Sequence, residues 1–496
     1  MHRFSNIAVA RGDFRTSAIR EPVPFWVLFA ACGLGCAMLI LKPMVVLGVA
    51  AAILGACAMV YLSAAIFSGK VEPLVLLWVL IFPLGYYFFS FPRDKSIITY
   101  DRVLVMALVL AIGFISRDKL PLVPRDLRHC AIAWMAFLVV ATLSVTQAKN
   151  LFTTGRLLVD GFYLPTILGW VVVRYFRVEQ NAAKLHLFVS IMAIYVACIG
   201  LAEMVLKQDL LPLPGAAIGF AGTLPRPNGP FDSDDEFALI GVLTFFLLLF
   251  LRNLLAGKLT FRRRVLHYLG VTASLATALM PMFRSVGISL MVVLLIASLS
   301  ARKPSRRFAG FTLLGCCVLV VLLASVLAPD TYADRSDPGN VYGRLAEQRQ
   351  TWRLFCSHPI VGVGLGQFAD VVARDTRYLE LYGNVRSVDS PHNTLGGVLA
   401  ETGVLGFVPY VTAQITLFLV FWHLRKQPRR NAQLAWTYFL YIFLGYWING
   451  MSLTVGYSSN TNLWFIFSIA VLYKYAMTEK LEPVGTGPTS VYSGVR

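Results

Sequence analysis

A histidine close to a carboxylate stands out in the stretch DSPHNTLGGVLAETGVLG, residues 389–406. Asn393 is placed to cap the helix that follows, and Gly403 is placed to end it in a left-handed conformation after about two and a half turns. His392 then lies just before the first turn, where Asp389 could accept its second ring proton. An imidazole oriented in this way can act as a general base, whereas a histidine without such support at a helix start usually has a structural role.

Three arginines could hold an anionic substrate. Arg284 lies between two apolar segments with almost no loop around it. An arginine near hydrocarbon costs about 2.5 to 3.5 kcal/mol on insertion scales, so such a residue either serves an anion or a cavity, or extends its charged end to the membrane surface. Arg344 lies in the long polar stretch before His392, and Arg226 lies next to a turn-forming Pro-Asn-Gly-Pro sequence.

The stretch GRLAEQRQTWRLFCSHPIVGVGLGQF, residues 343–368, predicts a short amphipathic helix. Trp352 is one of its large apolar residues, and the pair His358-Pro359 stops the helix. A glycine-rich turn follows, at Gly362, Gly364 and Gly366. Such a helix can hold Arg344 at the depth of the lipid headgroups, where the arginine binds either a substrate or merely lipid phosphate.

The acidic run at residues 232–236 has two interpretations. Its carboxylates could bind a divalent cation. Ser233 and Glu236, however, have the spacing of a capping box, and carboxylates favour the start of a helix, so helix capping is the preferred interpretation. Asp160 and Glu203 fall inside apolar segments, which indicates a transport path or the wall of a polar cavity.

The composition is that of a membrane protein. Hydrophobic residues make up 57% of the chain and charged residues 14%, whereas a soluble protein has about 25% charged residues. The net charge of +18 lies in short loops between apolar runs, so it does not indicate nucleic-acid binding. The eight cysteines have no metal-ligand spacing and predict neither a disulfide framework nor a zinc site. Soluble, disordered and coiled-coil classes are therefore excluded.

The apolar segments predict an all-α polytopic protein with about 12 to 14 transmembrane helices. The first segment is expected to be a retained anchor, because no cleavage site precedes a polar mature chain. The segments are residues 25–41, 44–67, 73–91, 102–116, 130–146, 157–173, 185–206, 236–251, 265–281, 285–300, 308–328, 400–422, 433–449 and 461–477.

The distribution of Lys and Arg predicts the orientation. With the N-terminus in the cytoplasm, the inner loops hold about three times as many of them as the outer loops, once one long outer loop is left out. Cytoplasmic loops carry such an excess, so both termini are predicted to be cytoplasmic. The strongest anchors are Arg262, Arg263, Arg264, Arg302, Lys303, Arg306 and Arg307.

This orientation predicts six consecutive parts of the chain. Two of them are outer loops long enough to carry function. The parts are N-terminal transmembrane helices at residues 1–206, a first outer loop at 207–235, central transmembrane helices at 236–328, a large outer loop with short helices at 329–399, C-terminal transmembrane helices at 400–477, and a flexible cytoplasmic tail at 478–496.

The chain over roughly residues 220–410 resembles the O-antigen ligase and Wzy-type O-antigen polymerase superfamily of bacterial inner-membrane glycosyltransferases. The ligases share a His-Asn pair, nine residues, Gly, two residues and Gly, and His392, Asn393, Gly403 and Gly406 fit this pattern. An upstream block of the family is matched by Arg344, Trp352, His358, Pro359, Gly362, Gly364, Gly366 and Phe368.

Two further segments are similar to the family less closely. Arg284-Ser285 resembles its Ser-Arg segment, but Phe283 stands where the family has serine before the arginine. Arg226 and the following residues 229–231, Gly-Pro-Phe, resemble its arginine and Gly-x-Phe segment.

The resemblance implies a fold related to the C-type glycosyltransferases and the transfer of a saccharide from undecaprenyl diphosphate to an acceptor hydroxyl. The outer side is then the periplasm, and the residue 329–399 loop is catalytic. His392 is the expected base. Arg284 and Arg344, with Arg226, are expected to hold the diphosphate without a metal or cofactor, and the reaction is expected to invert the sugar. Asp389, Asn393, Trp352, Gly403 and Gly406 are expected to support the site.

Three acceptors are compatible with this activity: a lipid A core sugar, the end of another lipid-linked polysaccharide, and a protein hydroxyl. They correspond to a ligase, a polymerase and an oligosaccharyltransferase. A polysaccharide-unit transporter is the alternative from another class. It would be expected to show paired repeats and binding residues at the membrane midplane, whereas the polar residues here concentrate in the outer loops.

Overall fold

The apolar segments predicted between residues 73 and 477 all form helices in the computed structural model, so the predicted all-α class is confirmed. The first two predicted segments lie outside the described residues, except for residues 60 and 62–67. The structure describes residue 60 and residues 62–88, 90–92, 96–114, 123–211, 219–221, 224–255, 259–301, 303–327, 338–379, 381–382, 385–386 and 390–478.

The first half of the described chain is a series of apolar helices followed by a small hairpin. The helices are α3 (Val71–Phe88), α4 (Tyr100–Gly113), η1 (Arg125–Leu127), α5 (Arg128–Ser144), η2 (Val145–Gln147), α6 (Leu151–Leu158), η3 (Val159–Tyr163), α7 (Leu164–Tyr175) and α8 (Val178–Leu206). η3 is a π-helix that joins α6 to α7. Strands β1 (Gly219–Ala221) and β2 (Leu224–Arg226) then pair antiparallel.

The second half is also mainly helical and contains a second short hairpin. Its elements are α9 (Asp234–Leu254), α10 (Phe261–Leu279), α11 (Arg284–Ser300), α12 (Pro304–Leu327), α14 (Pro338–Ser357), α15 (Phe368–Arg374), β3 (Leu381–Tyr382), β4 (Val385–Arg386), α16 (Thr394–Lys426), α17 (Arg430–Gly450), η4 (Val455–Tyr457) and α18 (Ser459–Met477). Helix α14 ends at Ser357, just before His358-Pro359, as the predicted amphipathic helix requires. Helix α15 begins at Phe368, after the predicted glycine-rich turn.

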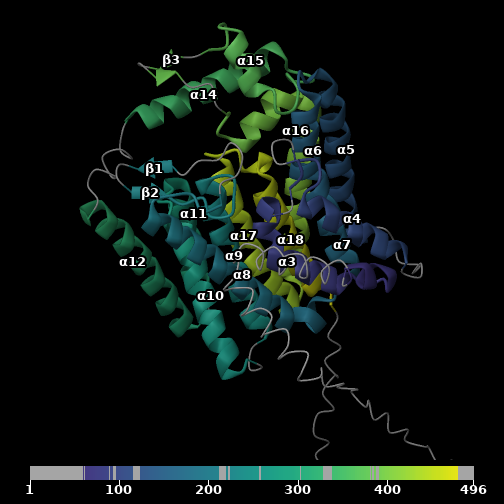
Figure 1. Ribbon diagram of the computed structural model, residues 1–496, viewed down its shortest axis with the longest axis vertical. Coiled ribbons are helices and arrows are strands. Elements are labelled where there is room, and N and C mark those ends of the chain that lie inside the picture. Colours follow the sequence, from purple (N-terminus) through teal and green to yellow (C-terminus); the bar gives the residue numbers. More distant parts are fainter. Residues whose placement is uncertain are drawn as a thin grey trace, which may run out of the picture. The chain divides into compact units, whose positions relative to one another are not determined.

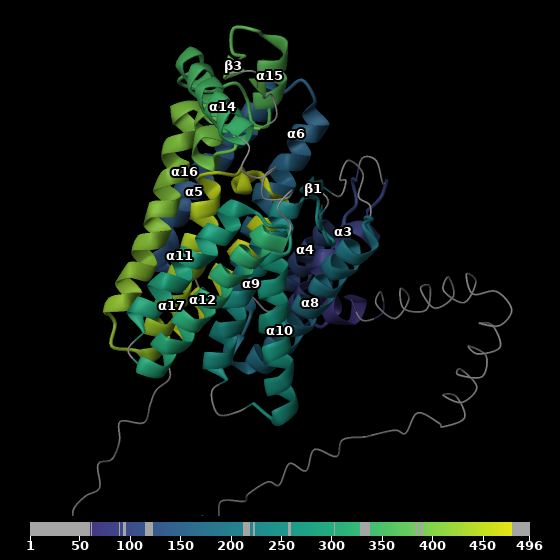
Figure 2. The same ribbon diagram turned by 90° about the vertical axis from the view of Figure 1, so that its left-hand side faces the viewer.

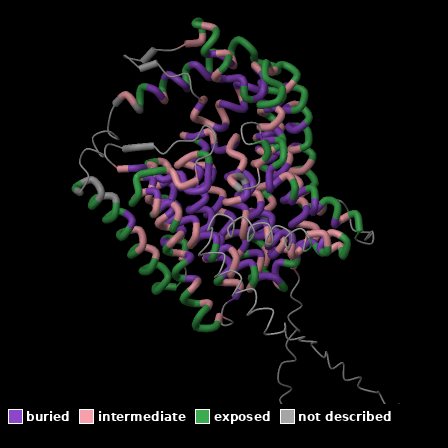
Figure 3. Tube along the Cα trace, in the orientation of Figure 1, coloured by how far each residue is buried: buried purple, intermediate pink, exposed green. Residues whose placement is uncertain are grey.

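Helix α9 forms the centre of the described bundle. Nearly every side chain from Glu236 to Leu251 is buried, because α9 packs against α8, α10, α17 and α18. A helix that is apolar on all faces is stable only when it is surrounded in this way. Figure 3 shows the buried residues concentrated in the middle of the bundle and the exposed ones around its edge.

The outer helices expose large apolar side chains, which identifies a multi-pass membrane protein. Ile132 and Met135 on α5 and Val408 and Ile415 on α16 are each more than half exposed. Among the described residues, five helical stretches are long and apolar enough to cross a membrane, and they are Arg125–Gln147, Leu151–Tyr175, Val178–Leu206, Asp234–Leu254 and Thr394–Lys426. The total of 12 to 14 spans stays a prediction.

Helices α14 and α15 lie together at one end of the bundle, in both views of the ribbon (Figures 1 and 2). Helix α16 runs from this end down the side of the bundle beside α5. Residues that the sequence singled out for chemistry, in 226–236, in α14 and at His392, therefore lie near the starts of α9 and α16.

Candidate active site

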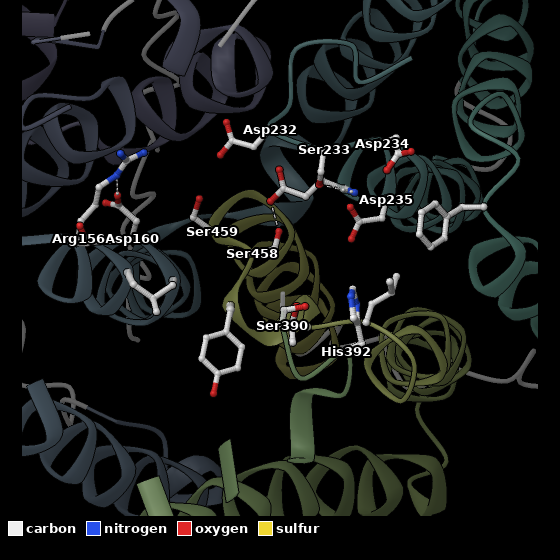
Figure 4. A pocket seen from close by; sticks show the side chains of 18 of the residues that line it. Arg156, Asp160, Asp232, Ser233, Asp234, Asp235, Ser390, His392, Ser458 and Ser459 are labelled. Carbon is white, nitrogen blue, oxygen red and sulfur yellow. Dashed lines mark hydrogen bonds and ion pairs between the residues drawn. The ribbon is translucent and has the colours of Figure 1, made fainter. Parts of the chain in front are cut away.

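A cavity of about 720 Å³ lies where the starts of α9 and α18, the π-helix η3 and the segment before α16 meet. Figure 4 shows polar side chains from these elements around it. Only tertiary folding brings them together, because they are far apart in the sequence. The charged and imidazole-bearing residues that line it are Arg156, Asp160, Arg226, Asp232, Asp234, Asp235, Glu236, Arg344 and His392.

His392 lines this cavity from the position just before the N-cap of α16, as the sequence predicts. Asn393 caps the helix, since its Oδ1 accepts a hydrogen bond from the backbone N–H of Gly396 at 3.0 Å. The backbone of His392 has a φ of 42°, a conformation that is uncommon outside glycine and often found at functional sites. The cap and this backbone geometry together direct the imidazole toward the cavity.

The carboxylate beside His392 belongs to Glu347 of α14. His392 Nε2 lies 3.4 Å from Glu347 Oε1, and Arg344 Nη1 lies 3.6 Å from Oε2 of the same carboxylate. The Glu347 side chain is only 4% exposed and does not line the cavity, so it lies behind the two residues that do. The predicted partner, Asp389, lies outside the described residues. The i,i+3 spacing of Arg344 and Glu347 is the sequence signal that points to this carboxylate.

Arg226, at the end of β2, reaches the same cavity. It forms an ion pair with Asp234, and its Nε donates a hydrogen bond to the carbonyl of Pro281 at 3.3 Å. Its guanidinium carbon also lies 5.0 Å from the centre of the Phe283 ring. Arg284 is the exposed first residue of α11 and does not line the cavity, although its neighbour Phe283 does. The structure thus brings Arg226 and Arg344 to the cavity of His392 and leaves Arg284 outside it.

The acidic run at residues 232–236 starts helix α9. Ser233 is the N-cap, and its Oγ lies 3.5 Å from the backbone N–H of Glu236. The Glu236 carboxylate accepts hydrogen bonds from the Ser458 hydroxyl and, at 3.0 Å, from the Asn460 amide, so it fastens α9 to the start of α18. The capping role of Ser233 is confirmed, while Glu236 bonds to α18 instead of completing the capping box.

Within the described part of the chain, no group of three or more His, Cys, Asp or Glu side chains is arranged to hold a metal ion. The preferred explanation of the acidic run as a helix start fits this arrangement. Whether the reaction needs a metal stays a prediction, addressed by the assay below.

The predicted glycine-rich turn follows α14 and packs on α16. Its glycines have φ values of 71°, 102° and 68°, at Gly362, Gly364 and Gly366. The N–H of Val363 donates to the carbonyl of Ala400 at 3.1 Å. The buried side chain of Glu401 accepts hydrogen bonds from the backbone N–H of Gly366 at 2.8 Å and of Phe368 at 3.0 Å. Glu401, which sequence reasoning did not single out, therefore holds the turn in place.

Gly403 has the predicted positive φ, of 60°, and its non-helical backbone separates two helical parts of α16. The first part, which Asn393 caps, ends at Gly403 as predicted, and the second part continues beyond the kink. The preceding loop supplies acceptors at the kink: Val404 N–H donates to the carbonyl of Pro359 at 2.9 Å, and Leu405 N–H donates to that of Ile360 at 3.1 Å.

Two other predicted supporting residues lie outside the cavity. Gly406 packs against Thr402, whose Oγ1 would lie 2.2 Å from a Cβ at this position. Trp352 is 61% exposed, and its ring lies 5.4 Å from that of Phe355 on the same helix. Gly406 therefore permits close packing within the turn of α16 after the kink, and Trp352 lies on the outer surface of α14.

The two acidic residues predicted inside apolar segments both have partners. Asp160, in η3, binds Arg102 through two contacts of 2.8 Å and lies 3.5 Å from Arg156. Glu203 accepts a hydrogen bond from the backbone N–H of Gly229 at 2.8 Å and so holds the loop after β2. Asp160 and Arg156 line the cavity, whereas Glu203 does not. The i,i+4 spacing between Arg156, just before the apolar segment 157–173, and Asp160 within it is the signal that could have identified Arg156.

Comparison with known families agrees with this geometry. Residues 237–411 match the family model described as O-antigen ligase. The match begins in α9, contains Arg344, Glu347, the glycine-rich turn and His392, and ends in α16 just beyond the kink. No curated protein matches the chain. The similarity to the O-antigen ligase family therefore rests on residues 237–411, which carry an O-antigen ligase domain.

Proposed function

We propose that this protein transfers a saccharide from undecaprenyl diphosphate to an acceptor hydroxyl at the periplasmic face of the bacterial inner membrane. The observation that carries the proposal is a single cavity, bordered by the O-antigen ligase domain, in which Arg226, Arg344 and His392 lie together. A phosphate-binding group and a proton acceptor in one cavity are the two requirements of this transfer.

Arg226 and Arg344 hold the lipid diphosphate in this proposal. A guanidinium can donate two parallel hydrogen bonds to phosphate oxygens and needs no metal to do so. Glu347 supports this role because its carboxylate lies behind Arg344 and His392, so the cavity meets the guanidinium and the imidazole first. Arg284 lies outside the cavity, at the exposed start of α11 beside Phe283, so this proposal does not use it as a diphosphate ligand.

The proposed reaction is a single displacement. The acceptor oxygen attacks the anomeric carbon while the bond from that carbon to the diphosphate oxygen breaks, and the electron pair leaves on the diphosphate. The hydroxyl proton passes to the imidazole of His392, whose Nε2 faces Glu347 at 3.4 Å. Glu347 orients the ring and stabilises the imidazolium that forms, as an orienting carboxylate does for other catalytic histidines. One displacement inverts the anomeric configuration.

The purified protein in nanodiscs is expected to transfer glycan from undecaprenyl diphosphate in excess EDTA at the untreated rate. The reason is that arginines, and no metal, neutralise the leaving group in this mechanism. The assay follows the release of undecaprenyl diphosphate and the glycosylated product together. Activity that is lost in EDTA and restored only by magnesium or manganese would contradict the arginine mechanism. The carboxylates of residues 232–236 would then be the candidate metal ligands.

The acceptors are compared in the same assay. A lipid A core saccharide, a second lipid-linked glycan and a serine-containing protein correspond to ligase, polymerase and oligosaccharyltransferase. The product identifies which of the three acts on the donor. A transporter would move the donor and release no undecaprenyl diphosphate, so this readout also separates the two classes of protein.

A cysteine on α14 is expected to react with an impermeant maleimide in cells with a permeabilised outer membrane. Cys356 is exposed at the end of α14, so a variant that keeps it as the sole cysteine reports on which side this end of the bundle lies. A matched variant with Ser305→Cys as the sole cysteine, at the exposed start of α12, is expected to react only after lysis. The reverse pattern would overturn the proposed orientation and the periplasmic site with it.

A further inference from the structure

The cavity has two chemically different ends. In Figure 4 the Arg156–Asp160 pair lies on one side of the pocket and His392 on the other, with Ser458 and Ser459 between them. The proposed reaction uses the His392 end. The other end, which we call the Arg156 end, consists of Arg156, Asp160 and Asp232 together with nearby hydroxyl side chains.

Asp160 is fixed in position by residues outside the cavity. Arg102 of α4 binds both of its oxygens at 2.8 Å and also donates hydrogen bonds to the backbone carbonyls of Ser96 and Ile97. The π-helix that carries Asp160 is held as well, because the Asn462 amide donates to the carbonyl of Gly161 at 2.9 Å. A π-helical turn inside a longer helix is often found at a functional site.

Arg156 is positioned by this carboxylate. Its Nε lies 3.5 Å from Asp160 Oδ2, one helical turn away. The side chain of Arg156 is 31% exposed and that of Asp160 is 14% exposed, although both line the cavity. Arg102 already binds both oxygens of Asp160. The longer contact between Asp160 and Arg156 therefore serves to orient the Arg156 guanidinium along the cavity wall.

Asp232 completes the Arg156 end. Its side chain is exposed within the open cavity, and burial of its surroundings raises the pKa of Asp232, while Arg156 lowers it and Asp160 raises it. Two cations, Arg102 and Arg156, thus face two carboxylates, Asp160 and Asp232. The formal charges balance at this end, and both of the carboxylates lie on the cavity wall.

The Arg156 end offers both hydrogen-bond donors and acceptors, from Arg156 and Asp232. A sugar hydroxyl both donates and accepts hydrogen bonds, so it can donate to a carboxylate and accept from a guanidinium. Hydroxyl groups from Thr153, Tyr457, Ser458 and Ser459 add further partners of the same kind.

We propose that the Arg156 end of the cavity is a saccharide subsite, in which Arg156 and Asp232 hydrogen-bond the hydroxyl groups of an uncharged glycan. Arg102 and Asp160 are positioning residues for Arg156. The inference rests on the proposed function, because that transfer brings a glycan into this cavity from the donor and another from the acceptor. Glycans with uronic acids at the bound position are disfavoured by Asp232.

The test measures transfer by the full-length protein in nanodiscs, with the KM for the lipid-linked donor and for a saccharide acceptor determined separately. Arg156→Gln is expected to raise one KM by about 10- to 100-fold, the range for losing a hydrogen bond to a charged group. Inhibition by undecaprenyl diphosphate without glycan is expected to stay unchanged. A rise in the donor KM assigns the subsite to the donor glycan, and a rise in the acceptor KM assigns it to the acceptor.

A second variant and a control make the test independent of folding. Asp232→Asn keeps the shape of an exposed side chain and is expected to raise the same KM. Arg374→Gln breaks a comparable i,i+4 contact, of 3.8 Å with Asp370, on α15 outside the cavity, and is expected to leave both constants unchanged.

The outcomes against the subsite are distinct. Weakened inhibition by bare undecaprenyl diphosphate in Arg156→Gln would make Arg156 a diphosphate ligand and overturn the subsite. An active wild type whose two variants keep both KM values would overturn the subsite alone. A wild type that transfers nothing from the lipid-linked donor would overturn the proposed function and the subsite that rests on it.

Discussion

Replacing His392 by alanine is expected to lower the rate of glycan transfer by roughly 10²- to 10⁴-fold, the usual contribution of a general base. The binding of the lipid-linked donor is expected to persist, because the proposed diphosphate ligands, Arg226 and Arg344, are unchanged. Single-turnover rates and donor binding, measured on the same nanodisc preparation, separate the two effects. Added imidazole is expected to restore part of the rate in the alanine variant, since a diffusible base can enter the open cavity.

A histidine on the same helix provides the matched control. His423 is exposed in the last turn of α16, at the other end from His392, and its Nδ1 lies 2.6 Å from the carbonyl oxygen of Leu419. His423→Ala is expected to transfer glycan at the wild-type rate. A wild-type rate for His392→Ala at equal protein levels would show that His392 is structural, as a histidine before a helix cap often is.

A substitution at Glu347 tests whether this carboxylate orients His392 as a base. Glu347→Gln keeps the size of the buried side chain but removes the charge that faces both Arg344 and His392. A loss of rate smaller than that of His392→Ala, with no further loss in the double variant, is the pattern of residues that act as one unit.

The local features of the site were predictable because each depends on a few neighbouring residues. Asn393 caps its helix, and the glycines at 362, 364 and 366 adopt positive φ, since capping and left-handed turns are set by local chemistry. The pairing of His392 with Glu347 was not predictable, because it depends on how α14 packs across the start of α16. Asp389 was the nearest carboxylate in sequence, and proximity in sequence was the only guide available.

The helices, like the site, were predictable from the sequence only where local residues determine them. Apolar runs predicted the helices between residues 73 and 477, since burial in lipid or in the bundle requires continuous apolar stretches. The predicted ends fell short at polar residues, as where α8 begins at Val178 rather than residue 185. The π-helix η3 was not predicted, because its position depends on the contact between Asp160 and Arg102, which are 58 residues apart.

The kink of α16 requires glycine at position 403, and this requirement leads to the second large effect. Gly403 has φ 60° and ψ −167°, a combination that only glycine adopts readily. A Cβ at this position would lie 2.2 Å from the carbonyl oxygen of Ile360 and 2.7 Å from the nitrogen of Gly362. The Ile360 carbonyl accepts a hydrogen bond from Leu405 N–H, and Gly362 N–H donates to the His358 carbonyl, so neither atom can move away without breaking a bond.

Gly403→Ala is therefore expected to destabilise the protein by about 3 kcal/mol or more, the upper part of the range for forcing such a conformation on another residue. The loss follows from displacement of the glycine-rich turn that Glu401 holds against the helix. The turn follows α14, which carries Glu347 and Arg344, and packs against α16, which His392 precedes. Transfer activity is therefore expected to fall with stability. Thermal unfolding in detergent and transfer in nanodiscs measure the two consequences.

Gly315→Ala is the control for this variant. Gly315 lies on α12, where no atom lies within 4 Å of an added Cβ, and alanine is the better helix former. This substitution is expected to leave the unfolding temperature unchanged or slightly raised, and activity unchanged. A Gly403→Ala protein that unfolds at the wild-type temperature and transfers glycan at the wild-type rate would mean that the kink is not needed. The link from the glycine pattern to the alignment of Glu347 with His392 would then be wrong, even if His392 itself proves essential.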